Sequence, residues 1–90
     1  MLEAEQLLIK ARILYGLARF EEAQQITDSI HAKDITGYSR VRALQAQILF
    51  RTGAEEEARA AARSLLKRTP EKSRMFIRTD LEALMGPLGN

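Results

Sequence analysis

Leu-Tyr-Gly-Leu-Ala-Arg-Phe-Glu-Glu-Ala at Leu14–Ala23 and Leu-Phe-Arg-Thr-Gly-Ala-Glu-Glu-Glu-Ala at Leu49–Ala58 follow one plan. Each stretch has the pattern of a helix end, a tight turn and the acidic first turn of a second helix. Acidic side chains suit that position because the N-terminus of a helix carries a partial positive charge. Ala58 follows Ala23 by 35 residues, and a repeat of about that length predicts stacked helical hairpins.

The spacing of apolar residues predicts five helices, at residues 2–17, 20–32, 37–52, 54–68 and 70–85. In the first helix one apolar face consists of Leu7, Ala11, Leu14 and Ala18. A second set, Leu8, Ile9, Ile13 and Tyr15, widens this face, so we expect the helix to be buried on more than one side. No capping Ser, Thr, Asp or Asn precedes the helix, which fits either a frayed start or a piece of a longer chain.

Glycine, proline and threonine mark the helix boundaries. Gly53 is placed to end the third helix, because glycine readily adopts the left-handed conformation found there. Gly37 interrupts the polar connection 33–39, and Asp34 or Thr36 is a candidate cap for the third helix. Thr69 and Pro70 predict the N-cap and the first residue of the fifth helix. Gly86-Pro87 should end that helix and leave 86–90 as a loose tail.

The composition indicates one small globular domain of the all-α class. Of the 90 residues, 46% are hydrophobic and 29% are charged, and the net charge of +2 creates no strong field for a polyanion. The absence of cysteine excludes a disulfide framework, a thiolate metal site and a cysteine nucleophile. The acidic N-terminus does not resemble a signal peptide, and no apolar run approaches the roughly 20 residues that span a bilayer. We therefore expect no membrane insertion, and the cytoplasm is slightly favoured although the compartment is undetermined.

The paired helices and the 35-residue period resemble the tetratricopeptide repeat family. Small or apolar residues stand at matching family positions in both copies: Ala11 and Ala46, Leu14 and Leu49, Ala23 and Ala58, and Ile30 and Leu65, with Pro70 at the terminal proline. The resemblance implies two antiparallel hairpins stacked as a right-handed solenoid, with repeat one at about 4–36 and repeat two at about 37–70. A capping helix at about 70–85 would complete the single domain, 1–90.

Three positions depart from the family pattern, and one of them, the leucine of the first helix, holds Lys10 and Gln45. The family's tryptophan position holds Leu7 and Arg42, and its aromatic position on the second helix holds Thr27 and Ala62. A 35-residue period also fits the pentatricopeptide family, which reads RNA one base per repeat. Two copies are too few for such a register, so nucleic acid is disfavoured as a partner.

The family geometry implies a concave surface lined by the first helix of each pair. We expect this surface to bind a peptide or a partner helix through Leu8, Arg12, Tyr15, Gln47, Phe50 and Arg51, with Ile9, Ala43, Leu44 and Arg40 nearby. The competing interpretation is that a neighbouring repeat, the fifth helix or a second copy covers these side chains. The chain could then be a segment of a longer array or a self-associating module.

The remaining candidate features do not favour a catalytic or metal-binding site. A cationic stretch could bind nucleic acid, a phosphate group or an acidic partner, but it also fits a solvated helix face: Arg59, Arg63, Lys67, Arg68, Lys72, Arg74 and Arg78. His31 and Asp28 lack a third metal ligand, so His31 fits a helix end better than a metal site. We expect no enzymatic activity, no catalytic residue and no cofactor. In the fifth helix Met75, Phe76, Leu81, Leu84 and Met85 predict a lid on the last hairpin, although the same side chains could pair with another repeat.

Overall fold

The computed structural model describes residues 3–89. It contains five α-helices: α1 (Ala4–Gly16), α2 (Phe20–Ser29), α3 (Ser39–Arg51), α4 (Glu55–Arg68) and α5 (Glu71–Met85). A short 3₁₀ turn, η1 (Ala32–Asp34), lies between α2 and α3. No strand occurs in residues 3–89, and the predicted all-α class is confirmed.

The helix bounds recur at the spacing found in the sequence. α1 and α3 both have 13 residues, starting at 4 and 39 and ending at 16 and 51, and α2 and α4 start at 20 and 55. The turns that join the pairs also match. Ala18 has φ 62° and Gly53 has φ 100°, and each is followed by a backbone N–H that closes the helix end. The N–H of Arg19 donates to the Leu14 carbonyl at 2.8 Å, and that of Ala54 donates to the Leu49 carbonyl at 2.9 Å.

The second helix is shorter than the sequence predicts. It ends at Ser29 and not at Ala32, because Ile30 is extended, with ψ 125°, and turns its side chain into the core, where it is 3% exposed. The other described bounds lie within two residues of their predicted positions, and Leu2 falls outside the described residues.

The N-caps predicted for α3 and for α5 are both wrong. Tyr38 occupies the N-cap of α3 with no side-chain cap hydrogen bond, so neither Asp34 nor Thr36 serves there. Thr69 is buried and its hydroxyl donates back to the Leu65 carbonyl at 2.7 Å, which closes α4. Pro70 is consequently the N-cap of α5, and its carbonyl accepts from the Ser73 and Arg74 N–H groups.

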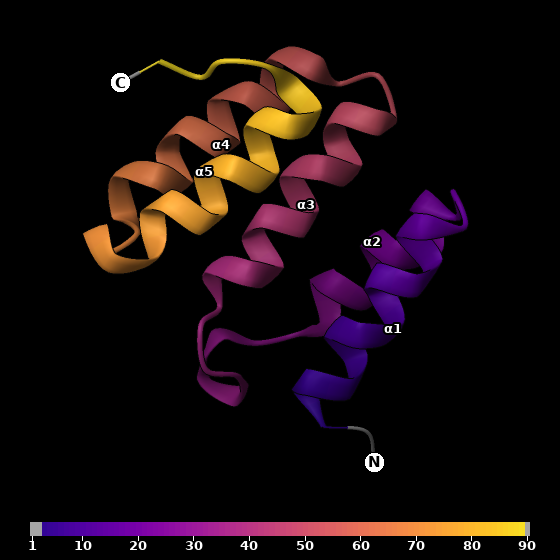
Figure 1. Cartoon of the computed structure of the whole chain (residues 1–90). Coiled ribbons are helices and arrows are strands. Elements are labelled where there is room, and N and C mark those ends of the chain that lie inside the picture. Colours follow the sequence, from indigo (N-terminus) through magenta and orange to yellow (C-terminus); the bar gives the residue numbers. More distant parts are fainter. Residues whose placement is uncertain (1–2, 90) are drawn as a thin grey trace.

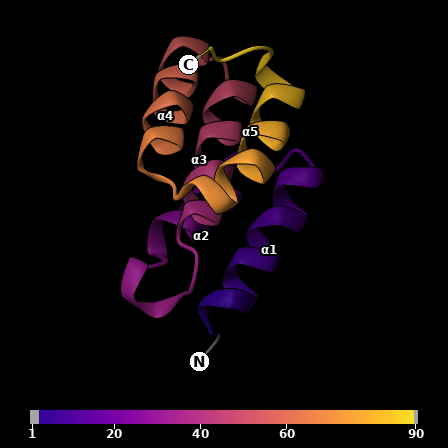
Figure 2. The ribbon, with the colours of Figure 1, turned by 60° about the vertical axis from the view of Figure 1, so that its left-hand side comes forward.

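The helices are arranged around α3. Figure 1 shows α1 and α2 on one side of α3 and α4 and α5 on the other. In the turned view of Figure 2, α3 lies between α4 and α5, with α1 and α2 below them. The molecule measures 40 × 28 × 16 Å along its principal axes.

The core is divided into two hydrophobic clusters that meet across α3. The first joins α1, α2 and the connection to the face of α3 that carries Val41, Leu44 and Ile48. The second joins α4, α5 and Leu88 to the face that carries Ala43 and Ala46. Within residues 3–89, α3 alone contributes buried side chains to both clusters.

Alanines lie at the helix contacts. Ala11, Ala23 and Ala58 are 0% exposed and Ala46 is 1% exposed. A small side chain at such positions lets two helix axes approach to the short end of the usual 8–10 Å range. The four alanines form two pairs, each 35 residues apart, and all four are buried.

Burial of α1 on more than one side is not found. Ile9, Ile13 and Leu17 are 57%, 58% and 63% exposed, and their spacing of four residues places them in one apolar stripe that points outward. The prediction therefore fails for Ile9 and Ile13, because no described helix covers that side.

The predicted lid is correct for only part of α5. Leu81 and Met85 are buried, whereas Met75 and Phe76 lie in the solvent. The expected loose tail is also wrong for residues 86–89. Leu88 is 5% exposed and its N–H donates to Glu82 at 2.8 Å, so this segment packs onto α5.

Candidate partner-binding groove

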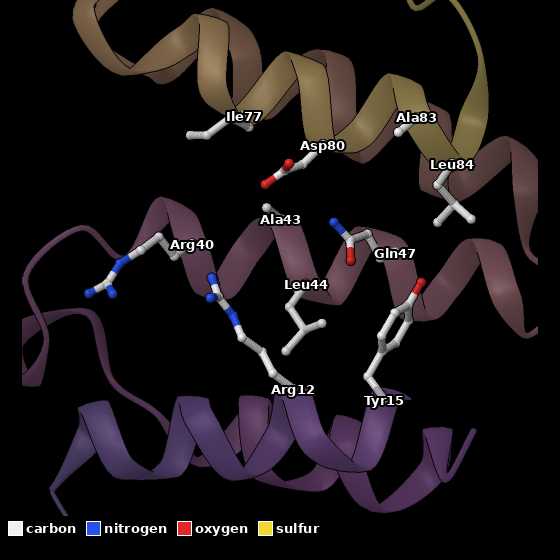
Figure 3. Close-up of a pocket in the computed structure, with 10 residues that line it drawn as sticks. All are labelled: Arg12, Tyr15, Arg40, Ala43, Leu44, Gln47, Ile77, Asp80, Ala83 and Leu84. Atoms are coloured by element: carbon white, nitrogen blue, oxygen red, sulfur yellow. The ribbon is translucent and has the colours of Figure 1, made fainter. Parts of the chain in front are cut away.

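A groove runs between α1 and α5, with α3 as its floor (Figure 3). Its volume is about 440 Å³, within the range of roughly 300–1,000 Å³ that is typical of ligand sites. Three helices line it: Arg12 and Tyr15 from α1, Arg40, Ala43, Leu44 and Gln47 from α3, and Ile77, Asp80, Ala83 and Leu84 from α5. We call this feature the α1–α5 groove.

The groove combines an apolar base with free polar tips. Ala43, Leu44 and Ile77 are buried and form the base. Figure 3 shows Arg12 and Tyr15 extending from α1, Asp80 and Leu84 from α5, and the Gln47 amide between them. Within residues 3–89, none of these polar side chains makes a side-chain hydrogen bond: Arg12, Tyr15, Gln47 and Asp80. Their donors and acceptors are available to an occupant.

Arg40 has a different role at one end of the groove. Its guanidinium donates to the Glu5 carboxylate and to the carbonyls of Thr36 and Gly37. The hydrogen bond from Arg40 lowers the pKa of Glu5 below its ordinary value, and the same bond raises the pKa of Arg40. Arg40 therefore joins α1 to the start of α3 at that end of the groove.

Half of the predicted site residues line the groove. The structure places Arg12, Tyr15 and Gln47 in the lining. Leu8 does not reach it, because this side chain is 2% exposed and belongs to the core between α1, α2 and α3.

The other two predicted residues lie beside the groove. Phe50 packs against the α4–α5 cluster, with the Arg59 guanidinium 5.8 Å from its ring centroid. Arg51 stacks on two rings near the α1–α2 turn, 5.8 Å from the centroid of Tyr15 and 5.2 Å from that of Phe20. Tyr15 and Phe20 contact each other edge to face, with centroids 5.6 Å apart. Arg51 thus holds the end of α3 against the first helix pair.

The sequence interpretation missed the wall formed by α5. Ile77, Asp80 and Leu84 are spaced three and four residues apart, so they share one helix face. Asp80 could have revealed this wall from the sequence, because a carboxylate among apolar residues indicates that this side of the helix is in contact with water. In the sequence-based prediction the fifth helix could cover the binding surface, but none of its residues was named as part of the site.

Two further features of the described residues bear on chemistry. Residues 3–89 contain no group of three or more histidine, cysteine, aspartate or glutamate side chains that could hold a metal ion. No helix in this part of the chain has both the length and the apolar character needed to cross a bilayer.

Comparisons of the chain with protein-family models, with curated proteins and with solved structures return no significant match.

Proposed function

We propose that the chain is a non-catalytic interaction scaffold of the tetratricopeptide kind, which holds a segment of a partner protein in the α1–α5 groove. The groove with its unpaired polar tips is the observation that carries the proposal. The family assignment is supported by the 35-residue recurrence of helix bounds and by the buried alanines at matching positions. In that arrangement α1 and α3 are the first helices of two repeats, and α5 closes the concave side.

The lining defines what a partner segment should look like. Apolar side chains would settle on Leu44, Ile77 and Leu84, where water is displaced from apolar surface. Gln47 carries both a donor and an acceptor, so its amide can pair with the backbone of an extended peptide. Arg12 and Asp80 lie on opposite walls and favour a segment with an acidic side chain toward α1 and a basic one toward α5.

A pair of alanine variants tests the groove. Ala83 lies exposed on the groove wall, and Ala60 lies exposed on α4 outside the lining, so Ala83→Arg and Ala60→Arg make the same change in size and charge. A displayed peptide library would be selected on the unmodified chain, and the enriched peptides measured by fluorescence anisotropy. We expect Ala83→Arg to weaken their binding about tenfold or more and Ala60→Arg to leave it unchanged. Failure to enrich any peptide, or equal binding to both variants, would refute the groove.

The exposed stripe on α1 favours a second function, assembly with another copy of the chain. Ile9, Ile13 and Leu17 form a continuous apolar face that a further helix would cover. Light scattering should then show a mass that rises with concentration, and Ile13→Glu should abolish the rise. A constant monomer mass at high concentration rules out self-association.

A further inference from the structure

A small hollow lies between α4 and α5, and it shares no lining residue with the α1–α5 groove. Its volume is about 60 Å³, compared with roughly 10–15 Å³ needed to hold one water. Four of its six lining residues are cationic: Arg63 and Lys67 from α4 and Arg74 and Arg78 from α5, with Leu66 and Gly89 completing it. We call it the basic hollow.

The cations of the basic hollow are poorly neutralised. Arg63 and Lys67 are four residues apart on one helix, as are Arg74 and Arg78 on the other, and like charges at that spacing repel. Within residues 3–89 the one ion pair these residues make joins Arg78 to Glu82 at 3.3 Å. Arg63 and Lys67 make no side-chain hydrogen bond to a described residue. An anion in the hollow would relieve this repulsion.

Arg74 supplies the second observation. One of its terminal nitrogens donates to the Thr69 carbonyl at 3.1 Å, which holds the side chain in place. Its Nε is buried and has no hydrogen-bond partner. A buried donor without a hydrogen-bond partner is unfavourable, and this nitrogen belongs to a side chain that lines the hollow.

Arg78 frames the hollow. Its guanidinium donates to the Gly89 carbonyl at 2.8 Å and to Glu82, and these bonds fix the last described segment against α5. The Gly89 carbonyl is thereby already paired. Both bonds use Nη1, so the donors without a described partner belong to Arg63, Lys67, Arg74 and the other two nitrogens of Arg78.

We propose that the basic hollow is a binding site for a phosphate group. Guanidinium forks match the oxygens of phosphate in pairs, and lysine adds a mobile point charge. The volume suits one tetrahedral oxyanion and excludes a nucleobase, and no aromatic side chain lines the hollow to stack on a base. A phosphate group is therefore favoured over a nucleic-acid strand.

A matched pair of lysine variants tests the site. Lys67 lines the hollow and Lys72, exposed on α5, does not, so Lys67→Gln and Lys72→Gln remove the same charge from different places. Inorganic phosphate would be titrated into the ¹⁵N-labelled chain at constant ionic strength, with chloride as the counter-titration. We expect saturable shifts confined to residues 63–67 and 74–78, weakened about tenfold by Lys67→Gln and less than about twofold by Lys72→Gln.

Three results would overturn the proposal. The first is an equal response to chloride, and the second is an equal loss of phosphate affinity in both variants. The third is tight binding of a single-stranded oligonucleotide without a localised phosphate response.

Phosphatidylcholine vesicles that contain phosphatidic acid distinguish the source of the phosphate. Co-sedimentation that Lys67→Gln abolishes assigns the site to a lipid headgroup, and a normal titration without co-sedimentation assigns it to a soluble phosphate.

Discussion

Exchanging glycine and alanine at the two helix-joining turns should change stability in opposite directions. Ala18 and Gly53 lie 35 residues apart in matching turns, yet only Gly53 is suited to a positive φ. We expect Ala18→Gly to stabilise the chain and Gly53→Ala to destabilise it. No heavy atom lies within 4 Å of a Cβ built on Gly53, so the effect there comes from backbone conformation and not from a clash.

The magnitude follows from two opposing terms. An L-residue other than glycine loses about 1–2 kcal/mol in the left-handed region. Glycine loses about 0.5–1 kcal/mol more conformational freedom than alanine when the chain folds. The difference between the middles of the two ranges leaves Ala18→Gly more stable by about 0.75 kcal/mol and Gly53→Ala less stable by a similar amount. For a domain of this size the melting temperature should move by roughly 2–8 °C.

Urea unfolding followed by circular dichroism at constant pH measures both changes. The midpoint should shift without a change in slope, because the surface exposed on unfolding stays the same. Gly16→Ala is the control, since Gly16 is helical, has no positive φ and has open space around its Cβ position. That variant should gain up to about 1 kcal/mol from helix propensity. A lower midpoint for Ala18→Gly, or a higher one for Gly53→Ala, would refute the reasoning.

Two further predictions concern contacts that join α3 to α1 and α2. Arg51→Met should lower the free energy of unfolding by about 1 kcal/mol, because it removes the contacts with both rings. A double-mutant cycle with Phe20→Leu, measured by urea unfolding, should give a coupling energy of at least ~0.5 kcal/mol. A coupling energy of zero would contradict the stacking. The lowered pKa of Glu5 means that its bond to Arg40 stabilises the fold above the ordinary value of 4.5 and is lost as the pH falls through the folded-state pKa. The urea midpoints of the unmodified chain and Glu5→Gln should therefore differ at neutral pH and converge in acid, and a constant difference would exclude this linkage.

Local signals in the sequence account for most of the fold. The turn residues and the acidic helix starts predict the bounds of α3, α4 and α5 to within two residues of those observed. They do so because glycine conformation and helix dipoles act over short distances along the chain. Thr69 shows where this reasoning fails. Its hydroxyl can bond forward or backward along the chain, and its burial against α4 decided for the Leu65 carbonyl.

The groove was harder to predict than the helices. Arg12, Tyr15 and Gln47, predicted from their position on the first helix of each pair, line the groove, whereas Leu8 lies in the core. Asp80 and Leu84 were missed since the face that α5 turns to α3 depends on tertiary packing. The stacking of Arg51 on Tyr15 and Phe20 joins residues from three segments, and no local pattern predicts it.

The position of α3 between two separate hydrophobic clusters has a consequence for how the molecule opens. If α1 and α2 detach, α3 still packs on α4 and α5. If α4 and α5 detach, α3 still packs on α1 and α2. Its backbone amides become accessible to solvent deuterons only when both sides have come apart. Residues 39–51 should thus keep their protons longest, with the two flanking pairs exchanging as independent units.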